Sequence, residues 1–442
     1  QAGHRYRDPG RGCLMLLPVL KMRHERGEIL KISVVGAGQM GEGLVAQMET
    51  MVGMRAHVVA DVVPGRAAEV LRSAGIREGD IVSTDDPEVA TRAVDSGKRV
   101  ATTNSEIAWV EPIDVTVEAT GIPDIGARVA HGAILARKHV VQMNVETDAT
   151  IGWLLRRQAI KAGVVYTLTA GDEPGATMEL YDFAVSLGFS VVCAGKGKNN
   201  PLDRSANPDT VAEQAEKKQM NPKMLASFVD GSKTMVEMTS LANAVGFTPD
   251  VPGMHGPQVT PKELAQVYVP RSQGGILSGV GRVEYGRGIA PGVFVIFTTE
   301  HPKLVRDLKY LSMGPGPYWA LYRPYHLTSL ETPISIARAA IYSDTTIATD
   351  LPPTAETVAV AKQPLQPGET LDSIGGHGTY GLIYTAAEAK KGRMLPLGLA
   401  PGAVVKRSIE IGQPLTYDDV SLDESLTIVD LRKLQDLELQ DA

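Results

Sequence analysis

Short apolar runs alternate with helix-compatible stretches over the first third of the chain. The apolar runs occupy residues 32–35, 57–60, 100–102, 114–121, 139–146 and 164–168, and helical patterns include residues 44–51 and 149–162. Short apolar runs are typical of buried strands, and strands that alternate with helices build parallel βαβ units. The pattern therefore predicts an α/β fold that begins with a Rossmann-type doubly wound parallel sheet over residues 31–168.

The pattern changes after residue 168 and predicts a mixed α+β domain over residues 169–350. Its expected elements are helices at 178–187 and 233–245, a strand at 189–194, antiparallel strands within 282–298, and a helix at 333–342 that returns to the first domain. The polar, Pro- and Asn-rich residues 201–222 predict a loop or lid. The aromatic stretch 310–327 is expected to be a loop that caps a pocket or to pack in the core.

A third, mostly β module is expected over residues 351–442. It follows a Leu-Pro-Pro sequence and contains β-like runs at 356–362 and 404–409. Turn residues separate these runs, and none of the polar residues in the module forms a pattern typical of catalysis.

The N-terminal residues imitate a signal peptide without completing one. Several arginines precede the apolar run 13–20, but Pro18 interrupts that run and the basic stretch 21–24 follows it. No stretch of the sequence has the ~18 apolar residues of a membrane span. We therefore expect residues 1–30 to form a helical arm beside the first strand, and we expect no membrane partner.

Charge and cysteine content narrow the class of protein further. The 442 residues carry a net charge of −7 and include two cysteines, Cys13 and Cys193. An acidic chain argues against nucleic acid or an anionic membrane as the main partner. Two cysteines make neither a disulfide framework nor a zinc motif, which favours a cytoplasmic location.

A glycine-rich turn joins the first predicted strand to the first predicted helix. In a dinucleotide site of this kind, one glycine forms the turn, the next admits the pyrophosphate and the last lets the helix pack closely. The helix N-terminus then offers unpaired N–H groups to the phosphates. We therefore expect a nicotinamide dinucleotide to bind at Gly36, Gly38, Gln39, Met40 and Gly41.

Residues at the ends of two further strands extend this site. Asp61 lies about 20 residues after Gly41, where an acidic side chain accepts the ribose hydroxyls of NAD. Such an acid repels the 2′-phosphate of NADP, although Arg66 offers an offsetting charge. Thr120 and Gly121 end the strand 114–121 at the edge where ligands of open α/β sheets bind. We expect them beside the nicotinamide, with a simple strand-end turn as the alternative.

Polar residues gather after the strand predicted at 189–194. Lys196, Lys198, Asn199 and Asn200 follow it in a glycine-containing loop. Lysine binds phosphate or protonates a developing alkoxide, and asparagine orients a hydroxyl or carbonyl group. These residues are therefore candidate catalytic residues, with a solvated loop as the alternative.

Three carboxylate residues and one pair of neighbouring polar residues are further candidates for the functional site. Asp172 and Glu173 lie in a predicted loop, and Glu237 lies off the apolar stripe of its predicted helix, where it points into a site or to solvent. Arg271 and Ser272 precede two glycines and are suited to cradling an anion with a guanidinium group and backbone N–H groups.

The order of the motifs resembles the homoserine-dehydrogenase-like oxidoreductases. The motifs are GAGQMG at 36–41, VEATG at 117–121, MNVE at 143–146, GDEPG at 171–175 and GKGKNN at 195–200. The C-terminal stretches at 368–371, 374–376, 395–400 and 417–420 resemble a SAF domain. The combination, which spans roughly residues 14–422, is similar to the 1-deoxy-D-xylulose 5-phosphate reductoisomerase-like proteins.

This resemblance implies a homodimeric, NADPH-dependent reductoisomerase. The implied reaction converts the sugar phosphate 1-deoxy-D-xylulose 5-phosphate to 2-C-methyl-D-erythritol 4-phosphate in isoprenoid precursor synthesis, the methylerythritol phosphate pathway. Asp61 departs from what an NADPH enzyme is expected to carry, so NAD is the alternative cofactor.

The implied rearrangement needs a base and an electrophile, and a divalent cation, Mg²⁺ or Mn²⁺, serves as the electrophile. Asp172 and Glu173 are then candidate metal ligands, and Glu237 is a candidate ligand or base. In this hypothesis the two lysines bind or protonate the substrate oxygens, the two asparagines orient its hydroxyls, and Arg271 with Ser272 binds its phosphate.

Two alternative functions stay open. A homoserine-dehydrogenase-like NAD(P)-dependent dehydrogenase of an alcohol or sugar acid needs the lysines and a carboxylate but no metal. A non-catalytic, cofactor-holding binding or sensor protein is the other alternative, and the polar cluster at 195–200 argues against it.

Overall fold

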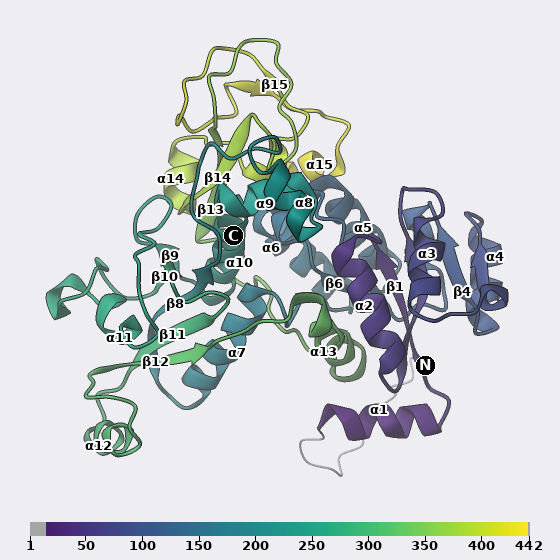
Figure 1. Ribbon diagram of the computed structural model, residues 1–442, viewed down its shortest axis with the longest axis horizontal. Coiled ribbons are helices and arrows are strands. Elements are labelled where there is room, and N and C mark those ends of the chain that lie inside the picture. The colour runs from purple at the N-terminus through teal and green to yellow at the C-terminus, as the bar shows by residue number, and fades with distance from the viewer. Residues whose placement is uncertain (1–14, 441–442) are drawn as a thin grey trace.

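The computed structural model describes residues 15–440 and shows a Rossmann-type sheet in its first part (Figure 1). The strands of this sheet are β1 (Leu30–Val35), β2 (Met54–Ala60), β3 (Ile81–Ser83), β4 (Arg99–Thr102), β5 (Val115–Glu118), β6 (His139–Gln142) and β7 (Tyr166–Leu168). All neighbours are parallel, in the order β3-β4-β2-β1-β5-β6-β7. The chain winds outward from β1 in both directions, so the predicted doubly wound parallel sheet is confirmed.

Helices cover this sheet and precede it. They are α1 (Leu16–Glu25), α2 (Gln39–Thr50), α3 (Arg66–Ser73), α4 (Pro87–Asp95), α5 (Pro123–Leu135) and α6 (Val145–Ala162). α1 is the described part of the predicted arm and buries Leu20 in the core of the sheet, whereas residues 1–14 lie outside the described residues. The strand predicted at 139–146 ends earlier, because Asn144 caps α6 by accepting a hydrogen bond from the N–H of Thr147 (3.2 Å).

A second sheet follows in the order β12-β11-β8-β10-β9. Its strands are β8 (Ser190–Lys198), β9 (Thr248–Pro249), β10 (Arg282–Arg287), β11 (Val293–Thr298) and β12 (Tyr318–Arg323). Of the two strands within the predicted antiparallel stretch 282–298, β11 is antiparallel to β8 and β12, whereas β10 is parallel to β8, which lies between β10 and β11. β12 replaces part of the predicted loop at 310–327, and its Trp319 is fully buried.

The lysine motif lies inside β8 rather than in a loop after it. The predicted strand ended at residue 194, but β8 continues to Lys198 and pairs with strands on both sides. Lys196 faces Tyr285 of β10 across the ladder, and Lys198 faces Arg287. Because alternate residues of a strand point to the same side, the two lysines share one face of the sheet.

The helices of the second part are α7 (Glu173–Ser186), α8 (Ala212–Lys218), α9 (Pro222–Val229), α10 (Ser232–Val245), α11 (Leu264–Val267), α12 (Pro302–Tyr310) and α13 (Thr332–Ala337). α10 confirms the predicted helix at 233–245 and lies at the centre of the molecule, where it packs on α6, α7 and β10 (Figure 1). α13 buries Ile336 in the core of the first sheet, as expected for a helix that returns there.

The described C-terminal residues form two antiparallel pairs of strands and two α-helices. These elements are β13 (Ala355–Ala361), β14 (Thr379–Thr385), α14 (Ala386–Lys391), β15 (Val404–Val405), β16 (Val420–Ser421) and α15 (Thr427–Glu438). The helix α15 was not predicted, and it packs on α5 and α6 of the first part. One hydrophobic core runs from these helices through α10 to β13, so the predicted domain boundaries stay a prediction.

Among residues 15–440, no helix combines the length and the apolar character needed to cross a membrane.

Candidate active site

The glycine loop has the conformation that a dinucleotide site requires. Gly36 has a φ of +100°, and a Cβ on Gly41 would lie 1.9 Å from the carbonyl oxygen of Gly36. A Cβ on Gly38, by contrast, would meet nothing within 4 Å, so this position stands open. α2 begins at Gln39, and no side chain of the described residues caps its first turn. The open glycine and the uncapped N–H groups therefore fit a pyrophosphate.

Asp61 lies at the end of β2 and supports the glycine loop. Its carboxylate accepts hydrogen bonds from the backbone N–H groups of Ala37 (2.8 Å) and Val63 (2.9 Å). The guanidinium group of Arg66 donates to Glu42 (2.5 Å) and to the carbonyl oxygen of Ala37 (3.0 Å). Glu42 thus already balances the charge of Arg66. The guanidinium group of Arg66 is therefore not free to balance a 2′-phosphate at the ribose end of the site.

A cavity of about 330 Å³ lies next to this turn. Residues 63–65, 67–68, 83–85 and 101–103 contribute its lining, at the carboxyl ends of β2, β3 and β4. Asp85 accepts hydrogen bonds from the hydroxyl of Thr102 (2.6 Å) and from the N–H of Thr103 (2.7 Å), and these bonds lower its pKa to about 2. The position and size of the cavity fit the adenosine part of a dinucleotide.

Thr120 and Gly121 lie at the carboxyl end of β5, where the sequence predicted them. Thr120 donates its N–H (2.7 Å) and its hydroxyl to Glu118, which is fully buried. Burial raises the pKa of Glu118 to about 7. Gln142 donates to the other carboxylate oxygen of Glu118 (3.1 Å), while its own Oε1 has no partner among the described residues. A titratable carboxyl group therefore lies beside the expected nicotinamide position.

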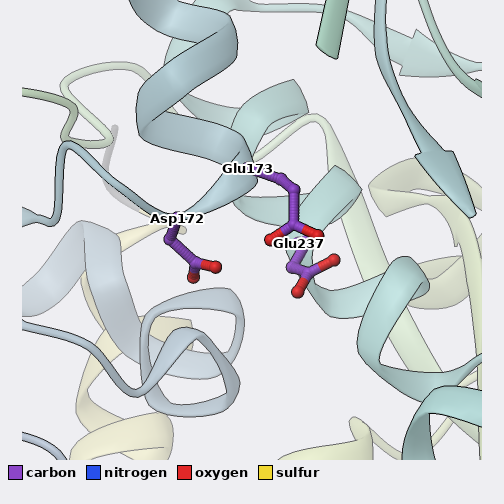
Figure 2. Close-up of side chains that lie close together, drawn as sticks. All are labelled: Asp172, Glu173 and Glu237. Atoms are coloured by element: carbon purple, nitrogen blue, oxygen red, sulfur yellow. The ribbon is translucent and has the colours of Figure 1, made fainter. Parts of the chain in front are cut away.

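Three carboxyl groups, those of Asp172, Glu173 and Glu237, lie close together, as Figure 2 shows. Asp172 stands just before α7 and Glu173 is its first residue, so both lie at a helix start rather than in the predicted loop, and Pro174 in the first turn favours this earlier start. Glu237 points at them from α10 and is 2% exposed, which excludes a solvated helix face. One oxygen from each of the three side chains lies within 4.8 Å of the others.

Lys196 links two of these carboxylates. Its Nζ donates a hydrogen bond to Glu173 (2.5 Å) and another to Glu237. Burial lowers the pKa of Lys196, but the two carboxylates outweigh burial and raise it above its ordinary value. Burial and the charge of Glu173 raise the pKa of Glu237 to about 7, and burial with both glutamates raises the pKa of Asp172. Lys196 is therefore a permanent ammonium ion, whereas Glu237 titrates near neutral pH.

Lys198 differs from Lys196 in its surroundings. Its Nζ donates a hydrogen bond to the carbonyl oxygen of Phe228 at the end of α9 (2.6 Å). Burial and repulsion by Lys196 lower its pKa to about 8. Lys198 therefore exchanges its proton near neutral pH, which is the property that a general acid or base requires.

Three residues that contact this cluster were not among the site residues predicted from the sequence. Lys233 of α10 donates to Glu146 in the first turn of α6 (3.1 Å), and His326 has its Nε2 3.4 Å from Glu173. Lys233 lies one helical turn before Glu237, and this spacing was the available signal. Because Glu146 follows β6, the contact between Lys233 and Glu146 joins this group of side chains to the carboxyl edge of the first sheet. We call the group formed by Asp172, Glu173, Lys196, Lys198 and Glu237 the lysine cluster.

Four predicted site residues lie away from this cluster. Asn199 is exposed and Asn200 is half-buried, both beyond the end of β8. Arg271 and Ser272 lie in a short 3₁₀ turn, where the Arg271 side chain is 63% exposed and donates to the carbonyl oxygen of Ile276 (3.0 Å). Within residues 15–440, no hydrogen bond or ion pair joins these four residues to the lysine cluster.

A divalent cation does not fit the cluster in this arrangement. Asp172, Glu173 and Glu237 offer the oxygen ligands that Mg²⁺ and Mn²⁺ prefer. However, the ammonium group of Lys196 already contacts Glu173 and Glu237 and supplies the positive charge between them. The geometry therefore does not support the predicted cation at Asp172 and Glu173.

Comparison with known families supports the class of protein that the fold and site define. Residues 171–332 match the family model described as Oxidoreductase DRL, catalytic domain. The matched stretch contains the three carboxyl groups and both lysines of β8. Together with the Rossmann-type sheet, the match supports an oxidoreductase, which is the coarser part of the sequence-based prediction.

A curated relative shares only a low sequence identity with the chain. The chain is 26% identical over 223 residues to the nitric oxide reductase FlRd-NAD(+) reductase of Aliivibrio fischeri, and the similarity covers 46% of this chain and 58% of that protein. The chain thus spans little more than half the length of this curated relative.

Solved structures resemble the chain only weakly. A probable dehydrogenase from Thermotoga maritima gives a TM-score of 0.41 at 11% identity, over 72% of this chain and 90% of that one. A myo-inositol dehydrogenase from Lactobacillus casei, in complex with NAD(H) and myo-inositol, gives 0.33 at 13% identity over 68% of each chain. TM-scores this low carry no argument about function.

Proposed function

We propose that the chain is an NAD(H)-dependent oxidoreductase that interconverts an alcohol and a carbonyl compound, with Lys198 as the proton donor and acceptor. The observation that carries this proposal is that Lys196 and Lys198 lie on one face of β8, where Lys196 is ion-paired with two buried carboxylates and Lys198 donates to a backbone carbonyl oxygen. The oxidoreductase family match over residues 171–332, which contains both lysines, supports it.

The contact between Lys233 and Glu146 supports a substrate position between the glycine loop and β8. Ligands of doubly wound sheets bind beyond the carboxyl ends of the strands, and Glu146 lies at that edge. A substrate there would lie between the expected nicotinamide and the ammonium groups of Lys196 and Lys198.

In the proposed chemistry the two lysines have different roles: Lys198 transfers a proton, and Lys196 stabilises negative charge. When bound, the nicotinamide supplies or accepts the hydride. In the direction of reduction, the ammonium group of Lys198 gives a proton to the carbonyl oxygen and becomes a neutral amine, and Lys196 stabilises the negative charge that develops on that oxygen. In the direction of oxidation, the neutral amine of Lys198 takes the hydroxyl proton. Glu173 and Glu237 hold Lys196 in place.

The surroundings of Asp61 favour NAD(H) over the NADPH that the family resemblance implies. Asp61 repels a 2′-phosphate, and Arg66 is already paired with Glu42. The name of the Aliivibrio fischeri relative, an NAD(+) reductase, agrees with this preference.

The reductoisomerase reaction is the second candidate. The observation that favours it is the number of ionisable groups in one cluster, since two lysines and three carboxyl groups exceed what simple hydride transfer needs. Its substrate would be 1-deoxy-D-xylulose 5-phosphate, its cofactor NADPH and its metal Mg²⁺ or Mn²⁺, as the motif resemblance implies.

One set of assays separates these candidates. NADH and NADPH binding are measured by fluorescence, and their oxidation is followed with 1-deoxy-D-xylulose 5-phosphate and with carbonyl forms of polyols and sugar acids, each with Mg²⁺ or Mn²⁺ and with a chelator. Turnover that survives the chelator and is lost in Lys198→Met supports the main proposal. Metal-dependent turnover of the sugar phosphate establishes the second candidate instead. Binding of neither nucleotide overturns both.

Other sequence-based expectations remain proposals. These are the homodimer, the cytoplasmic location, the SAF-like character of residues 351–442, the orientation of substrate hydroxyls by Asn199 and Asn200, and the binding of a substrate phosphate by Arg271 and Ser272. Light scattering of the purified chain tests the dimer, and the Michaelis constant of Arg271→Met for a phosphorylated substrate tests the phosphate site.

A further inference from the structure

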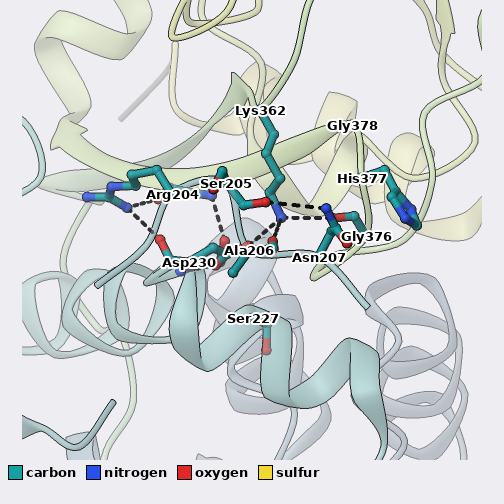
Figure 3. A network of polar contacts seen from close by, with 12 residues as sticks. Arg204, Ser205, Ala206, Asn207, Ser227, Asp230, Lys362, Gly376, His377 and Gly378 are labelled. Carbon is teal, nitrogen blue, oxygen red and sulfur yellow. Dashed lines mark hydrogen bonds and ion pairs between the residues drawn. The ribbon is translucent and has the colours of Figure 1, made fainter. Parts of the chain in front are cut away.

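A buried lysine of the C-terminal module reaches the segment that precedes α10. Lys362 follows β13, and its side chain is 2% exposed. Its Nζ donates hydrogen bonds to Asp230 (2.8 Å) and to the carbonyl oxygens of Ala206 (2.6 Å) and Gly376 (2.7 Å), as Figure 3 shows. An ammonium group has three donors, so the hydrogen-bonding capacity of Lys362 is fully used.

Asp230 directly follows α9, whose last turn carries the carbonyl group that holds Lys198. Asp230 and Gly231 join α9 to α10, and Phe228, which accepts the hydrogen bond of Lys198, lies within α9, two residues before Asp230. The carboxylate of Asp230 also accepts from the N–H of Ser232 (2.8 Å), and its carbonyl oxygen accepts from Arg204 (2.9 Å). Lys198 thus contacts the last turn of α9, and the Lys362–Asp230 ion pair holds the residue that directly follows this helix.

We propose that Lys362 and Asp230 are positioning residues for Lys198, so that the C-terminal module forms part of the active site of its own chain. This inference rests on the proposed role of Lys198. Asp230 is completely buried, and a buried ion pair contributes little net stability because both charges lose their water. What this pair does is fix the C-terminal end of α9, where the carbonyl group of Phe228 orients the Nζ of Lys198.

The pair also sets the charge around Lys198. The charged groups that act on Lys198 are Lys196 from β8, Arg204 from the segment after β8, Asp230 from the end of α9 and Glu237 from α10. Arg287 of β10 lies beside it in the ladder. Removing Lys362 leaves the negative charge of Asp230 unbalanced and favours the ammonium form of Lys198. Removing the charge of Asp230 leaves Lys362 and Arg204 unbalanced and favours the amine.

The test measures the protonation of Lys198 directly in the full-length chain. The pH dependence of lysine acylation is read by mass spectrometry at the peptide that contains Lys198, for the wild type, Lys362→Met and Asp230→Asn. We expect the labelling midpoint to rise by about one pH unit in Lys362→Met and to fall by about one unit in Asp230→Asn. Shifts of the same sign in both variants, or no shift in either, overturn the inference.

A double variant keeps the test decisive if a single substitution prevents folding. The double variant Asp230→Leu with Lys362→Met removes both charges together, so that neither is left buried without its partner. We expect it to fold and to lose at least about 10-fold in kcat, because Lys198 is no longer oriented, while its Kd for NADH is unchanged. A wild-type kcat in this variant overturns the inference.

The matched control is another buried ion pair of the C-terminal module, Glu356 with Arg432 (2.6 Å), which belongs to neither the end of α9 nor the lysine cluster. Glu356→Gln with Arg432→Met is expected to lower the melting temperature without moving the labelling midpoint of Lys198. If the midpoints move as expected but Lys198→Met keeps full turnover, the positioning role stands and the proposed catalytic role of Lys198 fails.

Discussion

The Nζ of Lys233 lies 3.1 Å from Oε1 of Glu146, and this contact joins the central helix α10 to the carboxyl edge of the Rossmann-type sheet. Lys233 is one helical turn from Glu237, which contacts Lys196. A continuous set of charged side chains therefore leads from the expected cofactor edge to the lysines of β8. This continuity is the structural reason for placing substrate and cofactor side by side.

Replacing Lys198 by methionine is expected to remove most of the turnover while cofactor binding persists. General acid–base catalysis contributes about 100-fold or more, and methionine keeps the volume of the side chain without its proton. The rate of NADH oxidation and the Kd for NADH are measured in parallel. Lys390→Met, on the exposed face of α14, is the control and should match the wild type. Near-normal turnover of Lys198→Met would show that another group transfers the proton.

The two directions of the reaction should depend on pH in opposite ways. The pKa of Lys198 is lowered to about 8 by burial and by Lys196. Reduction needs the ammonium form, so its kcat should fall as pH rises through about 8. Oxidation needs the amine, so its kcat should rise over the same range. Initial rates between pH 6 and 10 check this, and profiles that move in the same direction would contradict it.

Glu118 should make the protein less stable at and above neutral pH than at acidic pH. Burial raises its pKa from 4.5 to about 7, so between these values the folded chain binds a proton that the unfolded chain releases. The free energy of unfolding therefore falls as pH rises through this range, by roughly 3 kcal/mol in total.

Glu118→Gln should remove this loss of stability. The amide can still accept from Thr120, and a rotated Gln142 can direct its unpartnered Oε1 at the new N–H group. Urea unfolding at pH 5 and pH 8 measures the effect. We expect the variant to gain stability relative to the wild type at pH 8 but not at pH 5, and an equal difference at both pH values would refute this assignment.

Lys196→Met should create a cation site that the wild type lacks. The substitution leaves Glu173 and Glu237 without their ammonium partner, and removing one member of a buried pair costs about 3–5 kcal/mol. Mn²⁺ can replace the lost charge, because the three carboxyl groups converge. Mn²⁺ should therefore raise the melting temperature of Lys196→Met and leave that of the wild type unchanged. An equal rise in the wild type would favour the metal-dependent second candidate.

Asp61→Ser should shift cofactor preference toward NADPH. The change removes the charge that repels a 2′-phosphate, while the serine hydroxyl still accepts from the loop. The ratio of the NADPH and NADH dissociation constants, measured by fluorescence titration, should fall by about 10-fold. The substitution Asp80→Ser, in a surface turn away from the cavity, serves as the control.

The sequence predicted the parts of the fold that depend on near neighbours. The strand, glycine turn and helix at 30–50, the acid after β2 and the Thr-Gly end of β5 are set by residues adjacent in the chain. Periodicity also revealed α10, because its apolar stripe repeats along one helix. The predicted ends of strands were less accurate where a helix cap or a neighbouring strand decides them. Asn144 caps α6 and ends the strand before it, and pairing with β10 extends β8 to Lys198.

The tertiary structure alone decided which polar residues meet. Lys196 is separated from Glu173 by 23 residues and from Glu237 by 41, and Lys233 is separated from Glu146 by 87. The sequence identified lysines and carboxylates as candidates, but it could not show that an ammonium group stands where a metal ion was expected. It also could not separate the protonation of Lys196 from that of Lys198, because burial and neighbouring charge set each pKa, and both arise only when distant segments pack together.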